Sequence, residues 1–233
     1  MIQSSAADRH ANPDEHVSRL RLRISISLDG FTAGPNQSRQ EPLGVGGERL
    51  HEWVVALAAW RSAHGKDGGD VNESTAVVEQ EIANIGATIM GRNMFGGGPG
   101  TWSSTNPWNG WWGRNPPFHH PVFVLTNHAR APLVTEGGTT FTFVTDGIES
   151  ALDQARRAAG GKDVALAGGA RAAQQYLRAG LVDEMQLHMV PMLLGGGDRL
   201  FDTVSDLHGL GLVETVALPN VIHLRFERAQ QPQ

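Results

Sequence analysis

Two consecutive glycines, Gly168 and Gly169, separate the apolar run "DVALA" from a segment with helical spacing that begins near Ala170. Glycine lets the backbone approach a ligand closely, and the free amide groups at the start of a helix attract phosphate. The pattern therefore indicates a phosphate-binding turn. An ordinary tight turn between a strand and a helix has the same sequence, so that interpretation stays open.

Two other stretches place polar residues directly after an apolar run. One run ends at Gly91 and is followed by Arg92 and Asn93, and another is followed by Thr126 and Asn127. A guanidinium can hold a phosphate or carboxylate through two hydrogen bonds, and Thr and Asn can donate to phosphate or ribose. Each stretch could also be a plain surface turn. All three signals follow predicted strands, and open α/β sheets bind ligands at the carboxyl ends of their strands.

The elements that must position these residues alternate between strands and helices. Period-two alternation predicts a strand over 20–28, with Leu22, Ile24, Ile26 and Leu28 on one face. Short apolar runs predict further strands at 87–91, 122–126, 140–144 and 163–168. Helical spacing predicts helices over 49–60, 72–86, 148–160 and 170–180. Strands at 183–194, 212–218 and 221–228 close the chain, the last two as an antiparallel pair.

Two of the predicted helices have specific apolar faces. The helix over 49–60 places Leu50, Trp53, Val54, Leu57 and Trp60 on one side. The next helix has Asn72 as its N-cap and a stripe made by Val78, Ile82 and Ile85. The order of elements predicts an α/β fold with a mixed sheet, parallel in the middle and antiparallel at the end.

Composition limits the class of protein. The 233 residues are 40% hydrophobic and carry a net charge of −5, which is not typical of a protein that binds nucleic acid or anionic membranes. Cysteine is absent, so disulfides and thiolate zinc sites are excluded and a cytoplasmic location is expected. We expect one domain over 19–228, with tails at 1–18 and 229–233 and no membrane span.

A long segment rich in glycine and proline, 92–121, fits no regular element and holds four of the six tryptophans. Loops of this length are usually functional or mobile. Exposed Trp102, Trp108, Trp111 and Trp112 would suit a flat heterocycle or a partner subunit. The adjacent His119 and His120 lack carboxylate or cysteine companions, so no metal site is expected there.

Five stretches occur in the order typical of one superfamily: "SISLDGFTAGPN", "ATIMGRNMF", "VFVLTN", "VALAGGARAAQQYL" and "LVDEMQLHMVPMLLGGGDRLF". In these the chain resembles the dihydrofolate reductase-like superfamily, in particular the C-terminal reductase domain family of bacterial riboflavin biosynthesis. The resemblance covers about residues 20 to 228. It implies a three-layer α/β fold, a mostly parallel central sheet flanked by helices, with NADPH lying across its carboxyl edge.

The resemblance also assigns cofactor contacts residue by residue. Gly168, Gly169 and Ala170 would hold the pyrophosphate, where other dinucleotide-binding folds use G-x-G-x-x-G. Gly91, Arg92 and Asn93 would lie at the adenosine 2′-phosphate and the first pyrophosphate helix. Thr126 and Asn127 would line the adenosine, and Ala33 would approach the nicotinamide.

The implied chemistry is hydride transfer from the nicotinamide to a C=N or C=O carbon, which requires a proton donor nearby. Asp29 and Glu52 are the two candidates, although Asp29 could be a turn residue and Glu52 a solvated helix residue. Trp53, beside Glu52, and Trp102 are the candidate substrate contacts, and Trp53 could equally belong to the core.

The chain departs from the family pattern at 35–75 and 96–120, where the substrate would bind. We therefore expect an NADPH-dependent reductase of a small heterocycle, similar to 5-amino-6-(5-phosphoribosylamino)uracil reductase, and a homodimer. The alternatives are a dihydrofolate or pterin reductase, and a dinucleotide-binding protein or dimer module of the same fold without efficient turnover.

Overall fold

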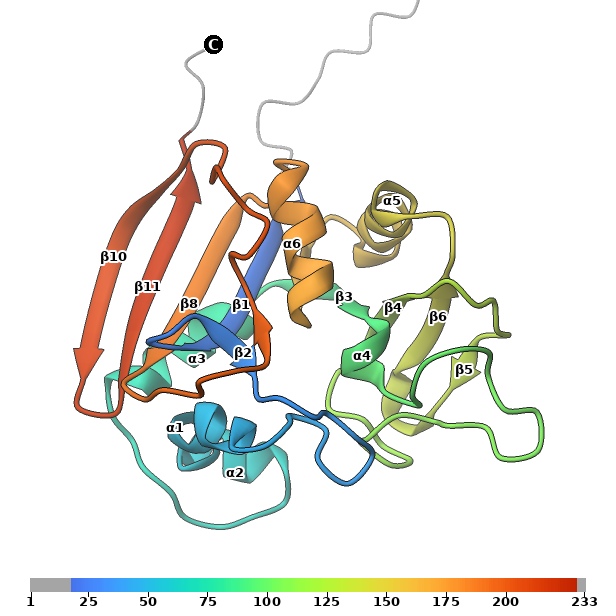
Figure 1. Ribbon diagram of the computed structural model, residues 1–233, viewed down its shortest axis with the longest axis horizontal. Helices are drawn as coiled ribbons and strands as arrows, with labels where there is room; N and C mark the ends of the chain where they lie inside the picture. The colour runs from blue at the N-terminus through green and yellow to red at the C-terminus, as the bar shows by residue number, and fades with distance from the viewer. Residues whose placement is uncertain (1–17, 230–233) are drawn as a thin grey trace, which may run out of the picture.

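The computed structural model describes residues 18–229 and has a central nine-stranded sheet (Figure 1). Its strands follow the order β10-β11-β8-β1-β7-β3-β4-β6-β5. Six consecutive strands in the middle of the sheet run parallel: β8 (Glu184–Val190), β1 (Leu20–Ser27), β7 (Asp163–Leu166), β3 (Ile85–Gly91), β4 (Pro121–Leu125) and β6 (Thr140–Val144). The antiparallel strands are β10 (Leu210–Leu218), β11 (Val221–Arg228) and β5 (Leu133–Val134). The expected mixed, mostly parallel sheet with antiparallel C-terminal strands is confirmed.

Helices cover both faces of this sheet. On one face α5 (Ile148–Ala159) and α6 (Ala170–Arg178) bury an aliphatic core with alternate residues of the inner strands, such as Leu22, Leu166 and Ile89. The other face carries α3 (Glu73–Ile82) and α4 (Arg92–Phe95). Short elements complete the chain: β2 (Phe31–Ala33) pairs with β9 (Asp198–Arg199), and the 3₁₀ turns are η1 (Gly47–His51) and η2 (Glu136–Gly138). No helix within 18–229 is long and apolar enough to cross a membrane.

The single helix expected over 49–60 is wrong. The chain forms η1, then α1 (Glu52–Val55), and after an extended Leu57 it forms α2 (Ala58–Ala63). Leu57 is extended because the backbone there bonds Asp70: Ala58 N donates to Asp70 O at 2.9 Å, and Asp70 N donates to Ala56 O at 2.8 Å. The expected core residues Leu50, Trp53 and Leu57 are nevertheless buried.

The next helix, α3, begins as expected but packs with a different face. The Asn72 side chain accepts from the amide of Ser74, and a capping box with Thr75 closes the first turn. Of the apolar stripe expected there, Val78 packs on the cluster around Trp53, but Ile82 is 55% exposed and Ile85 already belongs to β3. The buried residues of α3 are polar, Ser74 and Glu81, since the strands beneath it also present polar side chains.

The tryptophan-rich segment is irregular beyond α4, as expected. It is not a free aromatic surface: Trp102, Trp108 and Trp112 are half-buried and pack on the apolar cluster around Phe95 and Phe141. The tails expected at 1–18 and 229–233 lie almost wholly outside the described residues.

Candidate functional site

The two glycine turns singled out in the sequence meet at the carboxyl edge of the sheet. The amide of Gly91, at the end of β3, donates to the carbonyl of Gly168 at 2.7 Å. A Cβ added to Gly91 would lie 3.2 Å from the Cβ of Ala172, so the missing side chain lets α6 approach β3 closely. Gly168 has a φ of +111°, a backbone conformation that favours glycine. The backbone conformation therefore favours glycine at 168, and close packing favours it at 91.

Helix α6 begins directly behind this turn without a capping side chain. Gly169 is its N-cap and accepts from the amides of Ala172 and Ala173, and no side chain bonds the first turn. Ala170 is buried at the first helical position. A Cβ added to Gly169 would meet nothing within 4 Å, so there is open space over the turn. Uncapped amides beside open space can take an anion.

Arg92 lies at the same edge and is held by aromatic and backbone groups. Its guanidinium stacks on the Trp102 ring, 3.1 Å from Cζ to the ring centroid. It also donates to the Thr126 hydroxyl at 3.3 Å and to the carbonyl of Gly98 at 2.9 Å. The structure thus brings together Arg92, Thr126 and Trp102, which the sequence analysis assigned to separate parts of the site.

A second arginine, Arg130, completes this cluster. Its guanidinium lies 5.2 Å from the Trp102 ring and 5.0 Å from the Phe143 ring. Burial lowers the pKa of Arg92, and the nearby charge of Arg130 lowers it further. Within residues 18–229 no carboxylate forms an ion pair with either arginine. Two such cations favour binding of an anion.

The sequence analysis singled out Thr126 and Asn127 but missed Arg130, three residues further on. Arg130 follows Thr126 by a turn, and nothing in the local pattern shows that the chain folds its side chain back over Trp102. Asn93 and Asn127, the other two polar residues assigned to this edge, are exposed.

Asp29 is a turn residue with a strongly held carboxylate. It accepts from the Ser27 hydroxyl at 2.6 Å and from the amides of Leu194 and Gly195 at 3.1 and 2.7 Å. These bonds, the one from Ser27 foremost, lower the pKa of Asp29 to about 2. At neutral pH the side chain is therefore a carboxylate that joins β1 to the segment after β8, which fits the turn interpretation.

Ala33, assigned to the nicotinamide, lies in a tightly packed group of loops. It is buried at the end of β2, and a Cβ on Gly197 would collide with its carbonyl oxygen at 2.0 Å. A Cβ on Gly47 of η1 would come within 3.2 Å of the Gly34 nitrogen. The backbone around Ala33 is thus fixed by neighbouring glycines rather than by side chains.

Glu52 and Trp53 lie together at a cleft of about 240 Å³. The lining residues are Arg49, Glu52, Trp53, Val190, Pro191, Met192 and Asn220. Glu52 is exposed at its edge, whereas Trp53 is 5% exposed and donates through Nε1 to the Ser25 hydroxyl at 3.3 Å. The cleft therefore has a mostly apolar wall and a rim with one cation, one carboxylate and one amide. Asp29 does not line it.

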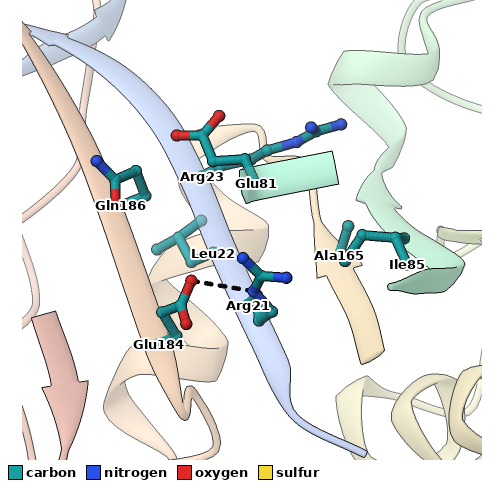
Figure 2. A pocket seen from close by; sticks show the side chains of 8 residues that line it. All are labelled: Arg21, Leu22, Arg23, Glu81, Ile85, Ala165, Glu184 and Gln186. Carbon is teal, nitrogen blue, oxygen red and sulfur yellow. Dashed lines mark hydrogen bonds and ion pairs between the residues drawn. The ribbon is translucent and has the colours of Figure 1, made fainter. Parts of the chain in front are cut away.

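A much smaller pocket lies under α3, where Arg21 forms ion pairs with Glu184 and Asp163 (Figure 2). Its volume of about 10 Å³ admits one water molecule at most. Figure 2 shows the Glu81 carboxylate and the Arg23 guanidinium pointing away from each other. The pocket is too small for a substrate. Within 18–229 no three or more His, Asp or Glu residues are grouped so as to hold a metal ion.

The strand order, the helices on both faces and the paired glycines at the carboxyl edge define an α/β protein of the dihydrofolate reductase-like fold class. The sequence matches the family model described as the RibD C-terminal domain over residues 19–224. The chain therefore belongs to the RibD C-terminal domain family, as the resemblance implied. No curated protein matches the sequence significantly.

Solved structures with the same fold come from several bacteria. One, from Shewanella sp. PV-4 and provisionally named as a riboflavin biosynthesis protein, has a TM-score of 0.56 and 18% identity, with 91% of this chain and 99% of that chain covered. RibD from Acinetobacter baumannii has a TM-score of 0.51 and 20% identity, with 91% of this chain and 58% of that chain covered. A third structure is that of a Thermotoga maritima diaminohydroxyphosphoribosylaminopyrimidine deaminase/5-amino-6-(5-phosphoribosylamino)uracil reductase. Its TM-score is 0.51 and its identity 14%, with 91% of this chain and 57% of that chain covered. The chain thus spans less than three-fifths of the last two.

Proposed function

We propose that this protein is an NADPH-dependent reductase that transfers hydride to a small heterocyclic substrate. Membership of the RibD C-terminal domain family supports an oxidoreductase. The observation that carries the choice of cofactor is the carboxyl edge of the sheet. The Gly91–Gly168 contact, the uncapped start of α6, and Arg92 and Arg130 follow the neighbouring strands β7, β3 and β4, and within residues 18–229 neither arginine has a carboxylate partner.

The residues at this edge fit NADPH by their chemistry. The open turn at Gly168 and Gly169, with Ala170 behind it, would take the pyrophosphate. Arg92, with Asn93 and Gly91 beside it, would take the 2′-phosphate, and we add Arg130 to this group.

Neighbouring segments would contact the adenosine and the nicotinamide, the two remaining parts of the cofactor. Thr126 and Asn127 would face the adenosine, and the backbone at Ala33 would face the nicotinamide. The bound cofactor supplies the hydride, and the protein orients it and provides the proton.

The cleft beside α1 is the proposed substrate site. Its apolar wall and its rim of Arg49, Glu52 and Asn220 suit a flat ring that carries polar substituents. Of the two candidate proton donors we favour Glu52, because Glu52 is at the cleft whereas Asp29 is held as a carboxylate by three hydrogen bonds. Trp102, the other substrate candidate, lies under Arg92 and is better placed to support the cofactor.

The substrate class follows from the relatives. The Thermotoga maritima enzyme acts as a 5-amino-6-(5-phosphoribosylamino)uracil reductase, so a pyrimidine of this kind is the first candidate. A pterin is the second, and binding of a dinucleotide without efficient turnover is the alternative from another class.

A homodimer is also proposed. Strand β10 is an edge strand of the sheet, and its Leu212 and Val213 are 55% and 52% exposed. Exposed apolar residues on an unpaired strand edge are a surface that a second copy can cover.

The test is a titration with NADPH and with NADH. Binding is detected by the quenching of tryptophan emission and by energy transfer to the nicotinamide. Six tryptophans, with Trp102 in contact with Arg92, make the signal strong. Micromolar binding with NADPH preferred, and turnover with a pyrimidine or pterin, is the expected result. Binding of NADPH without turnover of any pyrimidine or pterin tested would favour the dinucleotide-binding alternative. No binding at millimolar NADPH would overturn the proposal.

A further inference from the structure

The sheet face beneath α3 carries a row of polar side chains where a helix normally packs on apolar ones. Ser25, His188 and His223 stand side by side on β1, β8 and β11, because the register pairs Ser25 with His188 and His188 with His223. All three are buried, and Figure 1 shows α3 behind these strands. Buried polar groups need hydrogen-bond partners, so the row has to be satisfied from within.

The two histidines form the centre of a chain of contacts. The Nδ1 atoms of His188 and His223 are 2.8 Å apart. His223 Nε2 lies 2.8 Å from the Ser74 hydroxyl at the start of α3. His188 Nε2 lies 2.9 Å from Glu81 Oε1 near the end of α3, at ion-pair distance but without the geometry of a hydrogen bond. One helix thus closes both ends of a four-residue chain: Glu81, His188, His223 and Ser74.

The Nδ1–Nδ1 contact fixes where protons can be when both rings are neutral. One of the two nitrogens must donate and the other accept. The arrangement that also turns an N–H toward Glu81 has His223 donating through Nδ1 to His188, with His188 protonated at Nε2. His223 Nε2 then accepts from the Ser74 hydroxyl. This tautomer assignment follows from the network of contacts.

The same chain can take up one more proton without losing a contact. If a proton adds to His223 Nε2, that nitrogen donates to the Ser74 oxygen, which can also accept. The proton shared between the Nδ1 atoms shifts onto His188. His188 is then an imidazolium whose charge lies 2.9 Å from Glu81 Oε1. The net change is one proton taken from solvent, and the His188–His223 and His223–Ser74 contacts each still join a donor to an acceptor.

Trp53 packs on both imidazoles and separates them from the cleft. Its ring centroid lies 4.5 Å from that of His188 and 4.9 Å from that of His223. Its Nε1 is fixed by Ser25, the third member of the row. Trp53 also lines the cleft, as Glu52 does. A charge on His188 would add a cation–π attraction to this packing.

Besides Glu81, two further charged or titratable groups face the chain. They are His51 on η1 and Arg23 on β1. Burial lowers the pKa of His51, and His188 lowers it further. Burial, with His188 adding to it and Glu81 opposing it, lowers the pKa of His223 to about 4. His223 is therefore neutral at pH 7 and takes up a proton only on the acid side.

From this geometry we infer that Glu81, His188, His223 and Ser74 form a proton-holding chain in which His188 and His223 are positioning residues for Trp53. The role of Trp53 as a cleft wall rests on the proposed function, whereas the chain itself does not. Protonation of the chain strengthens the hold on Trp53 and thereby couples the cleft to pH.

The experiment measures the emission of Trp53 as the pH falls from 8 to 3. This emission is the difference between the protein and its Trp53→Phe variant. An imidazolium against an indole quenches its emission, so we expect a loss of Trp53 emission along one titration curve. His223→Asn keeps a polar group near the Nδ1 position but cannot pass a proton to His188, so its curve should be shifted from that of the parent protein. His208→Asn, which replaces an exposed histidine, is the matched control and should titrate like the parent protein.

Constant Trp53 emission over a pH range in which circular dichroism shows a folded protein would overturn the inference, as would an unchanged curve in His223→Asn. If that variant does not fold, NMR of the imidazole nitrogens in the unmodified protein decides. His188 and His223 must titrate as a coupled pair with one shared, strongly deshielded proton, and two independent ordinary titrations would contradict the chain. NADPH binding, measured separately, reports on the proposed function and not on this chain.

Discussion

The amide of Gly91 donates to the carbonyl of Gly168 at 2.7 Å and so ties the end of β3 to the turn before α6. This bond separates the roles of the two glycine turns. The Gly91 amide is already used, so Gly91 contributes by having no side chain next to Ala172. The amides left for an anion are those at the start of α6, behind Gly169.

Gly169→Ala is the cleanest test of the pyrophosphate turn. The φ of Gly169 is −75°, and a Cβ there meets nothing within 4 Å, so the variant should fold normally. If the cofactor covers this turn, the added methyl lies in its path. We expect NADPH binding to weaken by about tenfold or more, equivalent to about 1.4 kcal/mol, in a fluorescence titration.

Gly211→Ala is the matched control, since a Cβ there also meets nothing and the residue lies on β10, far along the sheet from β7. Normal NADPH affinity in Gly169→Ala would mean that the turn only joins a strand to a helix.

Arg92→Ala should weaken NADPH more than NADH. Hydrogen bonds to a charged group contribute about 1.5–3 kcal/mol, so we expect a loss of roughly ten- to a hundredfold for NADPH and a smaller loss for NADH. Titration with both nucleotides measures the ratio. Arg157→Ala, at an exposed position on α5, should change neither affinity. Equal losses for the two nucleotides in Arg92→Ala would remove the 2′-phosphate from the assignment.

Local patterns predicted the positions of the two glycine turns because these patterns depend on single turns. A strand that ends in Gly91–Arg92, or in Gly168–Gly169, places its residues at the carboxyl edge whatever the rest of the chain does. The contribution of Arg130 was not predictable in this way, because it depends on a side chain that folds back over Trp102 from a loop.

The polar face under α3 shows a different limit. Alternation in β1 gave the two faces correctly, but it could not say that a helix would cover the face with Arg21, Arg23 and Ser25. Helical periodicity looks for apolar stripes, so it assigned Ile82 to the core of α3 instead of Glu81. The break at Leu57 was likewise hidden, since it arises from backbone bonds to Asp70, which comes later in the chain.

Asp29→Asn should destabilise the fold in a pH-dependent manner. The pKa of Asp29 is lowered to about 2, so its contribution to stability is complete above about pH 4 and is lost as the pH falls toward 2. Thermal unfolding at pH 7 should therefore show a lower Tm for the variant, and the difference should disappear near pH 2. A difference that stays constant from pH 7 to pH 2 would contradict the role of the bonds to Leu194 and Gly195.

Val213→Lys should convert a homodimer into a monomer if the edge strand β10 forms the interface. The position is 52% exposed and lies at a bulge in β10, so the charge is tolerated in the monomer but not against a second apolar edge. Light scattering after gel filtration gives the mass. Val134→Lys, on the opposite edge strand β5, is the control and should leave the mass unchanged. A monomeric parent protein, or a dimeric Val213→Lys, would exclude this interface.

Glu52→Gln separates a reductase from a protein that only binds the dinucleotide. The residue is exposed at the rim of the cleft on α1, so the amide should not disturb folding. An amide cannot deliver a proton as a carboxyl group does, and general acid catalysis contributes about 10²–10⁴-fold to rate. We therefore expect turnover of the best pyrimidine or pterin to fall by roughly a hundredfold while NADPH affinity stays the same. Glu79→Gln, which replaces an exposed glutamate on α3, should change neither quantity. Unchanged turnover in Glu52→Gln would show that Glu52 is not the proton donor. A loss of NADPH affinity as large as the loss of turnover would show that Glu52 contributes to binding the cofactor and not to proton transfer.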